Sequence, residues 1–63
     1  MEFARRCAAD ARQGLLAALE RSADVHDRAV RTFGNAGDDQ RAETHRLAAL
    51  ADRARAAQIR DGA

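Results

Sequence analysis

The sequence of 63 residues contains no proline, tryptophan, tyrosine or lysine, and it has a single cysteine, Cys7. Without proline, glycine is the strongest helix breaker left in the chain. A lone cysteine cannot form a disulfide within one chain. Because no positively charged segment leads into an apolar run of the signal-peptide type, we expect a cytoplasmic protein.

Large aliphatic and aromatic side chains are also scarce. Leu, Ile, Val and Phe together supply 10 residues, whereas alanine supplies 17. Alanine has the highest helix propensity but adds little apolar surface to a core. No apolar run is longer than Leu15–Leu19, which is far shorter than the roughly 20 residues that span a bilayer, so we expect no membrane segment. The composition predicts a helical chain with a thin core, and disorder is the first alternative.

The chain lacks an excess of charge of either sign. All 11 basic residues are arginines, and 10 acidic residues are interleaved among them, so the net charge is +1. Nucleic-acid-binding domains usually carry a basic stripe, which makes this class of partner a disfavoured one. The bias toward arginine and alanine indicates a GC-rich bacterial genome. Oppositely charged residues spaced four apart predict a solvated helix face: Glu2 and Arg6, Asp24 and Arg28, Asp27 and Arg31.

The positions of glycine predict two helices joined by a short turn. From Glu2 to Phe33 the only glycine is Gly14, which costs a helix about 1 kcal/mol relative to alanine without having to end it. Gly14 could instead mark a kink or the close approach of another backbone. The run Gly34–Gly37 ends the first helix and Asp38 is a good N-cap for the second. We expect one domain over residues 1–63, with helices at about 2–33 and 38–60 and a turn at 34–37.

A connection of about four residues folds two helices back on each other as an antiparallel hairpin. In the first helix, residues spaced three and four apart predict the contact face: Leu16, Leu19, Ala23, His26, Val30 and Phe33. In the second helix, the predicted contact residues are Leu47, Leu50, Ala51, Ala54 and Ala57. Large side chains then lie opposite alanines, which allows the two helices to approach closely.

The first helix is longer than the second by about ten residues, so Phe3–Arg12 should project past the hairpin by roughly 15 Å. Apolar residues on this overhang and on a second flank of the same helix have no cover within the chain. They form the predicted interface: Phe3, Cys7, Ala11, Leu15, Ala18 and Val25. A second copy that completes a four-helix bundle is the simplest cover, and another helical protein is the alternative.

The two histidines are the side chains best suited to chemistry near neutral pH. His26 and His45 should lie within about one helical turn of each other, so a pH-sensitive or metal-binding pair is conceivable. No two His or Cys residues have the short spacing typical of metal sites. We expect instead that His26, on the contact face of the first helix, forms a hydrogen bond with a neighbouring carboxylate. Cys7 has no base near it in sequence, and two alanine-rich helices leave little volume for a pocket. We predict no catalytic residue, cofactor or metal site.

The stretch Phe33–Asp38, followed by Ala42, resembles the turn of a tetratricopeptide repeat, in which a Gly-Asp pair opens the second helix. The first helix is much longer than a tetratricopeptide helix, and the pattern has no second copy in the chain. The resemblance implies a protein-binding helical hairpin and assigns no site residues.

The sequence therefore favours a small non-enzymatic helical protein that acts by association with itself, or as a subunit, adaptor or regulator of another protein. A small nucleic-acid-associated regulator is the alternative, because Arg5, Arg6, Arg12 and Arg21 make the first helix modestly basic. A metal- or pH-responsive helical bundle is the lesser alternative.

Overall fold

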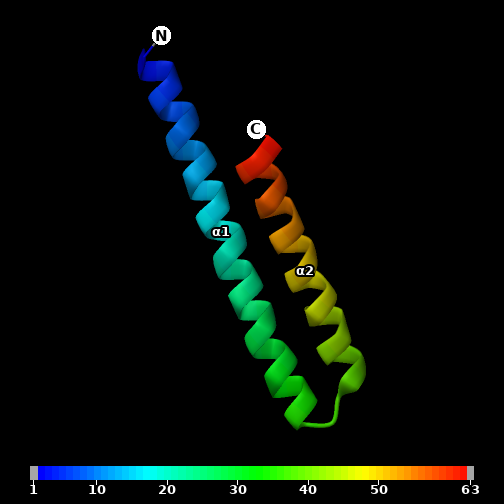
Figure 1. Cartoon of the computed structure of the whole chain (residues 1–63). Coiled ribbons are helices and arrows are strands. Elements are labelled where there is room, and N and C mark those ends of the chain that lie inside the picture. The colour runs from blue at the N-terminus through cyan, green and yellow to red at the C-terminus, as the bar shows by residue number, and fades with distance from the viewer. Residues whose placement is uncertain (1, 63) are drawn as a thin grey trace.

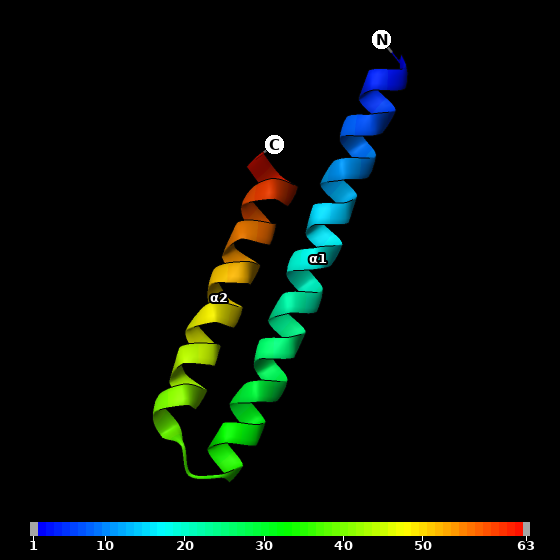
Figure 2. The ribbon, with the colours of Figure 1, turned by 180° about the vertical axis from the view of Figure 1, so that it is seen from behind.

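The computed structural model describes residues 2–62 and contains two α-helices, α1 (Glu2–Asn35) and α2 (Asp39–Gly62). They run antiparallel and side by side as a hairpin (Figures 1 and 2). The predicted all-α hairpin is confirmed, and the described residues include no strand. Each helix ends two residues later than the sequence predicts, at Asn35 and Gly62.

The turn between the helices is a Schellman motif that passes directly into an N-cap. Gly37 has a φ of 79°, a conformation that residues with a side chain rarely adopt. The Asp38 amide donates to the Phe33 carbonyl at 2.8 Å, and the Gly37 amide donates to the Gly34 carbonyl at 3.1 Å. The Asp38 carboxylate then accepts the Arg41 amide at 3.1 Å, which caps the start of α2.

Helix α1 continues through Gly14 without interruption. In Figures 1 and 2 it runs as one straight rod. Apart from the helix's own backbone, no atom lies within 4 Å of the position that a Cβ would occupy at Gly14. Within this hairpin, Gly14 therefore neither ends nor bends the helix, and it does not make room for α2.

The contact face predicted for the first helix is confirmed. All six of its side chains are buried or half-buried against α2: Leu16, Leu19, Ala23, His26, Val30 and Phe33. Ala23 is the most enclosed, with 1% of its surface exposed. The three-four spacing of apolar residues is a strong indicator in α1 because the opposite side of this helix is largely polar.

The contact face predicted for the second helix is wrong. Leu47 and Leu50 are 52% and 51% exposed, and the other three predicted contact residues, Ala51, Ala54 and Ala57, are exposed as well. The residues of α2 that face α1 are instead Ala42, His45, Ala49, Asp52, Ala56 and Ile59. At about 100° per residue, Leu47 and Leu50 lie about half a turn away from this face.

The rotation of α2 follows from the size of the side chains on α1. The α1 contact face already carries Leu16, Leu19 and Phe33, so alanines on α2 let the helix axes approach closely. Turning Leu47 and Leu50 inward would set large residues against large ones. Hydrophobicity alone favours the face with the two leucines, whereas the structure packs a stripe in which every second position is alanine and two of the others are polar.

The resulting hairpin is long and thin. Its backbone extends over 54 × 17 × 10 Å. Within residues 2–62 three residues are buried, and all are alanines: Ala23, Ala49 and Ala56. The start of α1 projects past the end of α2 (Figure 1), as predicted, and Arg12 marks the step by donating to the Arg60 carbonyl at 2.9 Å. Neither helix of the described chain is long and apolar enough to cross a membrane.

Candidate functional site

One flank of α1 exposes large apolar side chains to solvent. Phe3, Val25 and Leu15 are 80%, 60% and 41% exposed. With Cys7, Ala11 and Ala18, which are also exposed, they make up the predicted interface, and we call these six residues the α1 outer face. At about 100° per residue, the six lie within a sector of about 120°, centred roughly 110° away from the α1 contact face. The hairpin therefore leaves a second apolar stripe of α1 without cover from α2.

A second exposed apolar patch lies on α2, on the face that the sequence predicts to contact α1. Leu47 and Leu50 point away from α1, about half a turn from the α2 contact face. The exposure of Leu47 and Leu50 could have been predicted from a second stripe of α2. The residues from Ala42 to Ile59 that make up this stripe repeat the three-four spacing of the α1 contact face. That stripe includes His45 and Asp52, so hydrophobicity alone did not favour it.

The register brings the two histidines into direct contact. His26 Nδ1 and His45 Nδ1 are 2.8 Å apart, and the ring centroids are 5.0 Å apart. The His45 ring stacks on Phe33 at 5.5 Å, with 8° between the planes. Arg41 lies over the Phe33 ring at 5.6 Å, within the range of a cation–π contact. The carboxylate partner expected for His26 is thus replaced by His45.

The histidine pair has limited chemical capacity. A hydrogen bond between two Nδ1 atoms requires that one carries a hydrogen and the other accepts it, so at least one ring must be neutral. Two imidazoles supply half of the ligands of a tetrahedral metal site. Within residues 2–62, no group of three or more His, Cys, Asp or Glu side chains is placed to hold a metal ion. The geometry favours sharing of a proton over metal binding.

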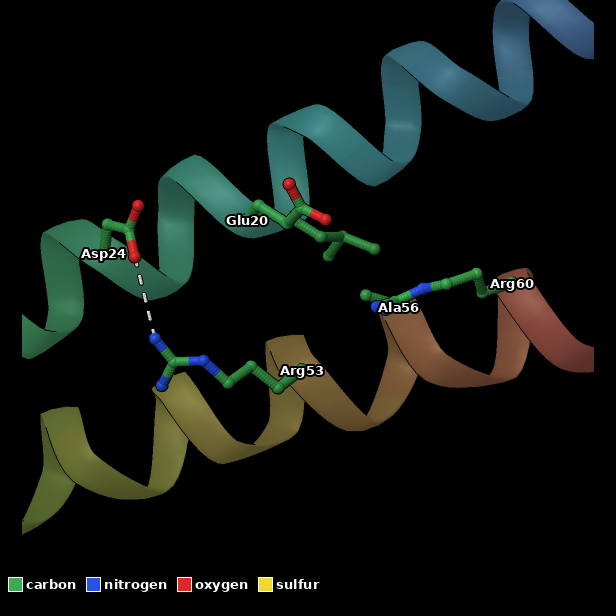
Figure 3. A pocket seen from close by; sticks show the side chains of 6 residues that line it. Glu20, Asp24, Arg53, Ala56 and Arg60 are labelled. Atoms are coloured by element: carbon green, nitrogen blue, oxygen red, sulfur yellow. Dashed lines mark ion pairs between the residues drawn. The ribbon is translucent and has the colours of Figure 1, made fainter.

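An arginine on α2 bridges two carboxylates on α1. Arg53 donates to both carboxylate oxygens of Asp27. It also forms an ion pair with Asp24 at 3.6 Å, which Figure 3 shows. The hydrogen bond from Arg53 lowers the pKa of Asp27, although partial desolvation opposes this effect. The same bond raises the pKa of Arg53. This pairing replaces the predicted pairs within α1, because Asp24 and Asp27 turn toward α2 and not toward Arg28 or Arg31.

A shallow hollow lies beside this ion cluster. It has a volume of about 380 Å³ and is lined by Leu19, Glu20, Asp24, Arg53, Ala56 and Arg60. In Figure 3 the acidic side chains come from α1, and the arginines and Ala56 come from α2. The lining holds carboxylates and guanidinium groups but no nucleophilic or acid–base side chain near neutral pH. Charge pairing between the helices accounts for this arrangement.

Two other predicted features lie on the exposed surface. Glu2 and Arg6 form the predicted ion pair at 3.8 Å, and both side chains are largely exposed. Cys7 is a free, exposed thiol on the overhang. Neither feature is close to the histidine pair, because both lie beyond the end of α2.

Comparison with known proteins gives no relative. No protein-family model matches the chain, and no curated protein or solved structure matches it significantly. The resemblance of the turn to a tetratricopeptide repeat therefore does not extend to a family match.

Proposed function

We propose that this protein acts by association, with the α1 outer face as its binding surface and a second copy of the chain as its partner. The observation that supports this proposal is the contrast between buried and exposed side chains. Among residues 2–62 the hairpin buries three alanines, whereas Phe3, Val25 and Leu15 stay 41–80% exposed. Exposed apolar surface of this kind is typical of helices that pack against another chain.

The exposed area supports an interface of ordinary size. A monomeric protein of 6.8 kDa typically exposes about 4,000 Å². This chain exposes 4929 Å², which is about 900 Å² more. In a standard protein–protein interface each partner buries roughly 800 Å². Burial of one such interface would bring the surface of this hairpin close to that of a compact protein.

A second copy is the partner that we favour. Two hairpins joined through α1 make a four-helix assembly, and a two-fold symmetric contact needs only one self-complementary surface. The net charge of +1 gives little repulsion between copies. A different helical protein, for which this chain would be a subunit, adaptor or regulator, is the other outcome of the test.

A role on nucleic acid has less support. Four of the arginines form ion pairs within the hairpin: Arg6, Arg41, Arg46 and Arg53. Arg12 is bound to the Arg60 carbonyl. These side chains are not arranged as a stripe for a phosphate backbone.

A pH-responsive role is a second candidate function, and it is favoured by the contact between His26 and His45. Histidine is the side chain that proteins use most often for switches near neutral pH, so a direct contact between two histidines is a suitable place for one. The two proposals are compatible, since the histidine pair lies between α1 and α2 and the α1 outer face lies on another flank.

Sedimentation and light scattering test the proposal with one matched pair of variants. We expect the wild-type chain to have about twice the monomer mass of 6.8 kDa or more, and its melting midpoint to rise with concentration. Val25→Glu should shift the chain toward monomer, and Leu47→Glu should not, although both residues are about equally exposed. A monomer whose sharp melting transition does not depend on concentration would contradict the proposal. If the chain alone shows no cooperative melt, a different protein is its partner.

A further inference from the structure

We infer that two copies pair α1 against α1 in antiparallel orientation, about a two-fold axis at Gly14 and Leu15. This inference rests on the proposed self-association and adds its geometry. It follows from one residue that the hairpin does not explain, Gly14, and from the arrangement of the α1 outer face around it.

Gly14 has no use within a single hairpin. It lies inside an unbroken helix of 34 residues, where it lowers stability by about 1 kcal/mol relative to alanine. No atom outside the helix backbone is within 4 Å of its missing Cβ. By helical periodicity Gly14 lies on the α1 outer face, between Ala11 and Ala18. A glycine there leaves space for the side chain of another helix.

The α1 outer face is centred on the same point. Its first member is Phe3 and its last is Val25, so their midpoint along the helix is residue 14. Two such faces in antiparallel orientation therefore overlap along their whole length. The most exposed large apolar side chain of one copy, Phe3, then lies near the next most exposed one of the other copy, Val25.

Side-chain sizes are complementary in this register. Gly14 of one copy lies opposite Leu15 of the other, so the space at the glycine receives the leucine. Ala11 lies opposite Ala18, and Cys7 lies opposite Ser22, which lets the helices approach closely on both sides of the axis. The axis is also level with the step where α2 ends, since Arg12 there contacts Arg60.

The parallel orientation fits less well. It would place Leu15 against Leu15 and Phe3 against Phe3, with Gly14 facing an empty space. It would also place the positive ends of the two helix dipoles side by side. In the antiparallel arrangement the dipoles oppose each other.

Disulfide trapping distinguishes the two orientations. In the antiparallel pair Cys7 lies about 15 residues, or roughly 22 Å, along the axis from Cys7 of the second copy, too far for a disulfide. Ser22→Cys places a second thiol opposite Cys7. We expect mild oxidation to convert Ser22→Cys into covalent dimer on a non-reducing gel, and to leave the wild type and the double variant Cys7→Ser/Ser22→Cys as single chains.

The outcomes separate this inference from the proposed function. Efficient Cys7–Cys7 cross-linking of the wild type would establish a parallel pair and overturn the inference. Lack of cross-linking in Ser22→Cys, in a chain that is dimeric by mass, would also overturn it and leave self-association intact. Monomer mass for every variant before oxidation would remove the proposed function together with its geometry.

Gly14 provides an independent test. Gly14→Leu meets no atom within the hairpin, so circular dichroism should show helicity at least equal to that of the wild type. The leucine would collide with Leu15 of the second copy, and self-association should weaken roughly tenfold or more. Gln13→Leu, on the opposite side of α1, should leave the dimer unchanged. Unchanged association in Gly14→Leu would overturn the inference.

Discussion

His26 and His45, 19 residues apart in sequence, face each other across the hairpin with their Nδ1 atoms 2.8 Å apart. One ring must donate and the other must accept, so the contact exists only while at least one ring is neutral. His45 also stacks on Phe33, which ties the pair to the end of α1 next to the turn. The contact joins α1 to α2 at a level where the rest of the interface consists largely of alanine.

We expect the contact between His26 and His45 to stabilise the hairpin. It is a hydrogen bond between half-buried side chains of α1 and α2, and removing one ring leaves the other without this partner in the helix interface. The contact contributes about 1 kcal/mol, and each kcal/mol moves the melting midpoint of a domain of this size by about 4–8 °C.

Thermal melts of the wild type and of His45→Phe at one protein concentration measure this effect. Phenylalanine keeps an aromatic ring next to Phe33 but cannot form the hydrogen bond, so the melting midpoint of this variant should be lower by roughly 4–8 °C. An unchanged midpoint would show that the contact between the two histidines does not stabilise the hairpin.

The fold was predictable from the sequence to the level of two helices and a turn, because those depend on local chemistry. Gly37 and Asp38 determine where α1 stops and α2 starts. The rotation of α2 was not predictable in the same way. Alanine occurs on every side of this helix, so the face with the two leucines and the face from Ala42 to Ile59 compete, and side-chain packing against α1 decides between them.

The candidate site was predictable to a similar degree. The α1 outer face and the proximity of His26 to His45 depend mainly on α1 and on the length of the turn, so they do not require the rotation of α2 to be known. The bridge from Arg53 to Asp27 does require it. Arginine pairing across helices leaves no pattern in a single sequence, whereas pairing at a spacing of four does.

We expect Ala56→Trp to disrupt the hairpin and Ala54→Trp to be tolerated. Ala56 is 2% exposed on the α2 contact face, whereas Ala54 is exposed on the opposite side of the helix. Overpacking a buried helix contact costs about 1 to 3 kcal/mol, and exposed substitutions usually change stability by less than about 0.5 kcal/mol. Urea unfolding followed by circular dichroism measures both. The contact face predicted from the sequence, with Ala54 against α1, would require Ala54→Trp to be the more destabilising of the two substitutions.

We expect Arg53→Ala to lower the melting midpoint more than Arg55→Ala does, and only at low salt. Arg53 joins α2 to Asp24 and Asp27 of α1, while Arg55 is exposed. Salt screens exposed ion pairs, so the difference between the variants should shrink at about 1 M NaCl. Because the pKa of Asp27 is lowered, the stabilisation is present above the pKa of an unfolded Asp, about 3.9, and is lost as the pH falls through the lower folded value. A difference that persists in high salt would point to packing of the Arg53 stem instead.

We expect Asp52→Ala to stabilise the hairpin. One carboxylate oxygen of Asp52 is buried in the helix interface and has no hydrogen-bond partner within the hairpin. An unpaired buried polar group costs about 1–3 kcal/mol, and alanine is also the better helix former. The substitution gives up the attraction between Asp52 and Arg53, which is weaker than the pairing of Arg53 with Asp27. The net gain should be about 1 kcal/mol, which would raise the melting midpoint by roughly 4–8 °C.

Asp10→Ala is the matched control for this substitution. Asp10 is exposed on α1, so its replacement changes helix propensity without releasing a buried oxygen. Melting both variants at one protein concentration keeps the contribution of self-association constant. If Asp52→Ala stabilises the chain no more than Asp10→Ala does, the buried oxygen carries no penalty. If Asp52→Ala lowers the melting midpoint, the attraction between Asp52 and Arg53 outweighs the penalty of the buried oxygen.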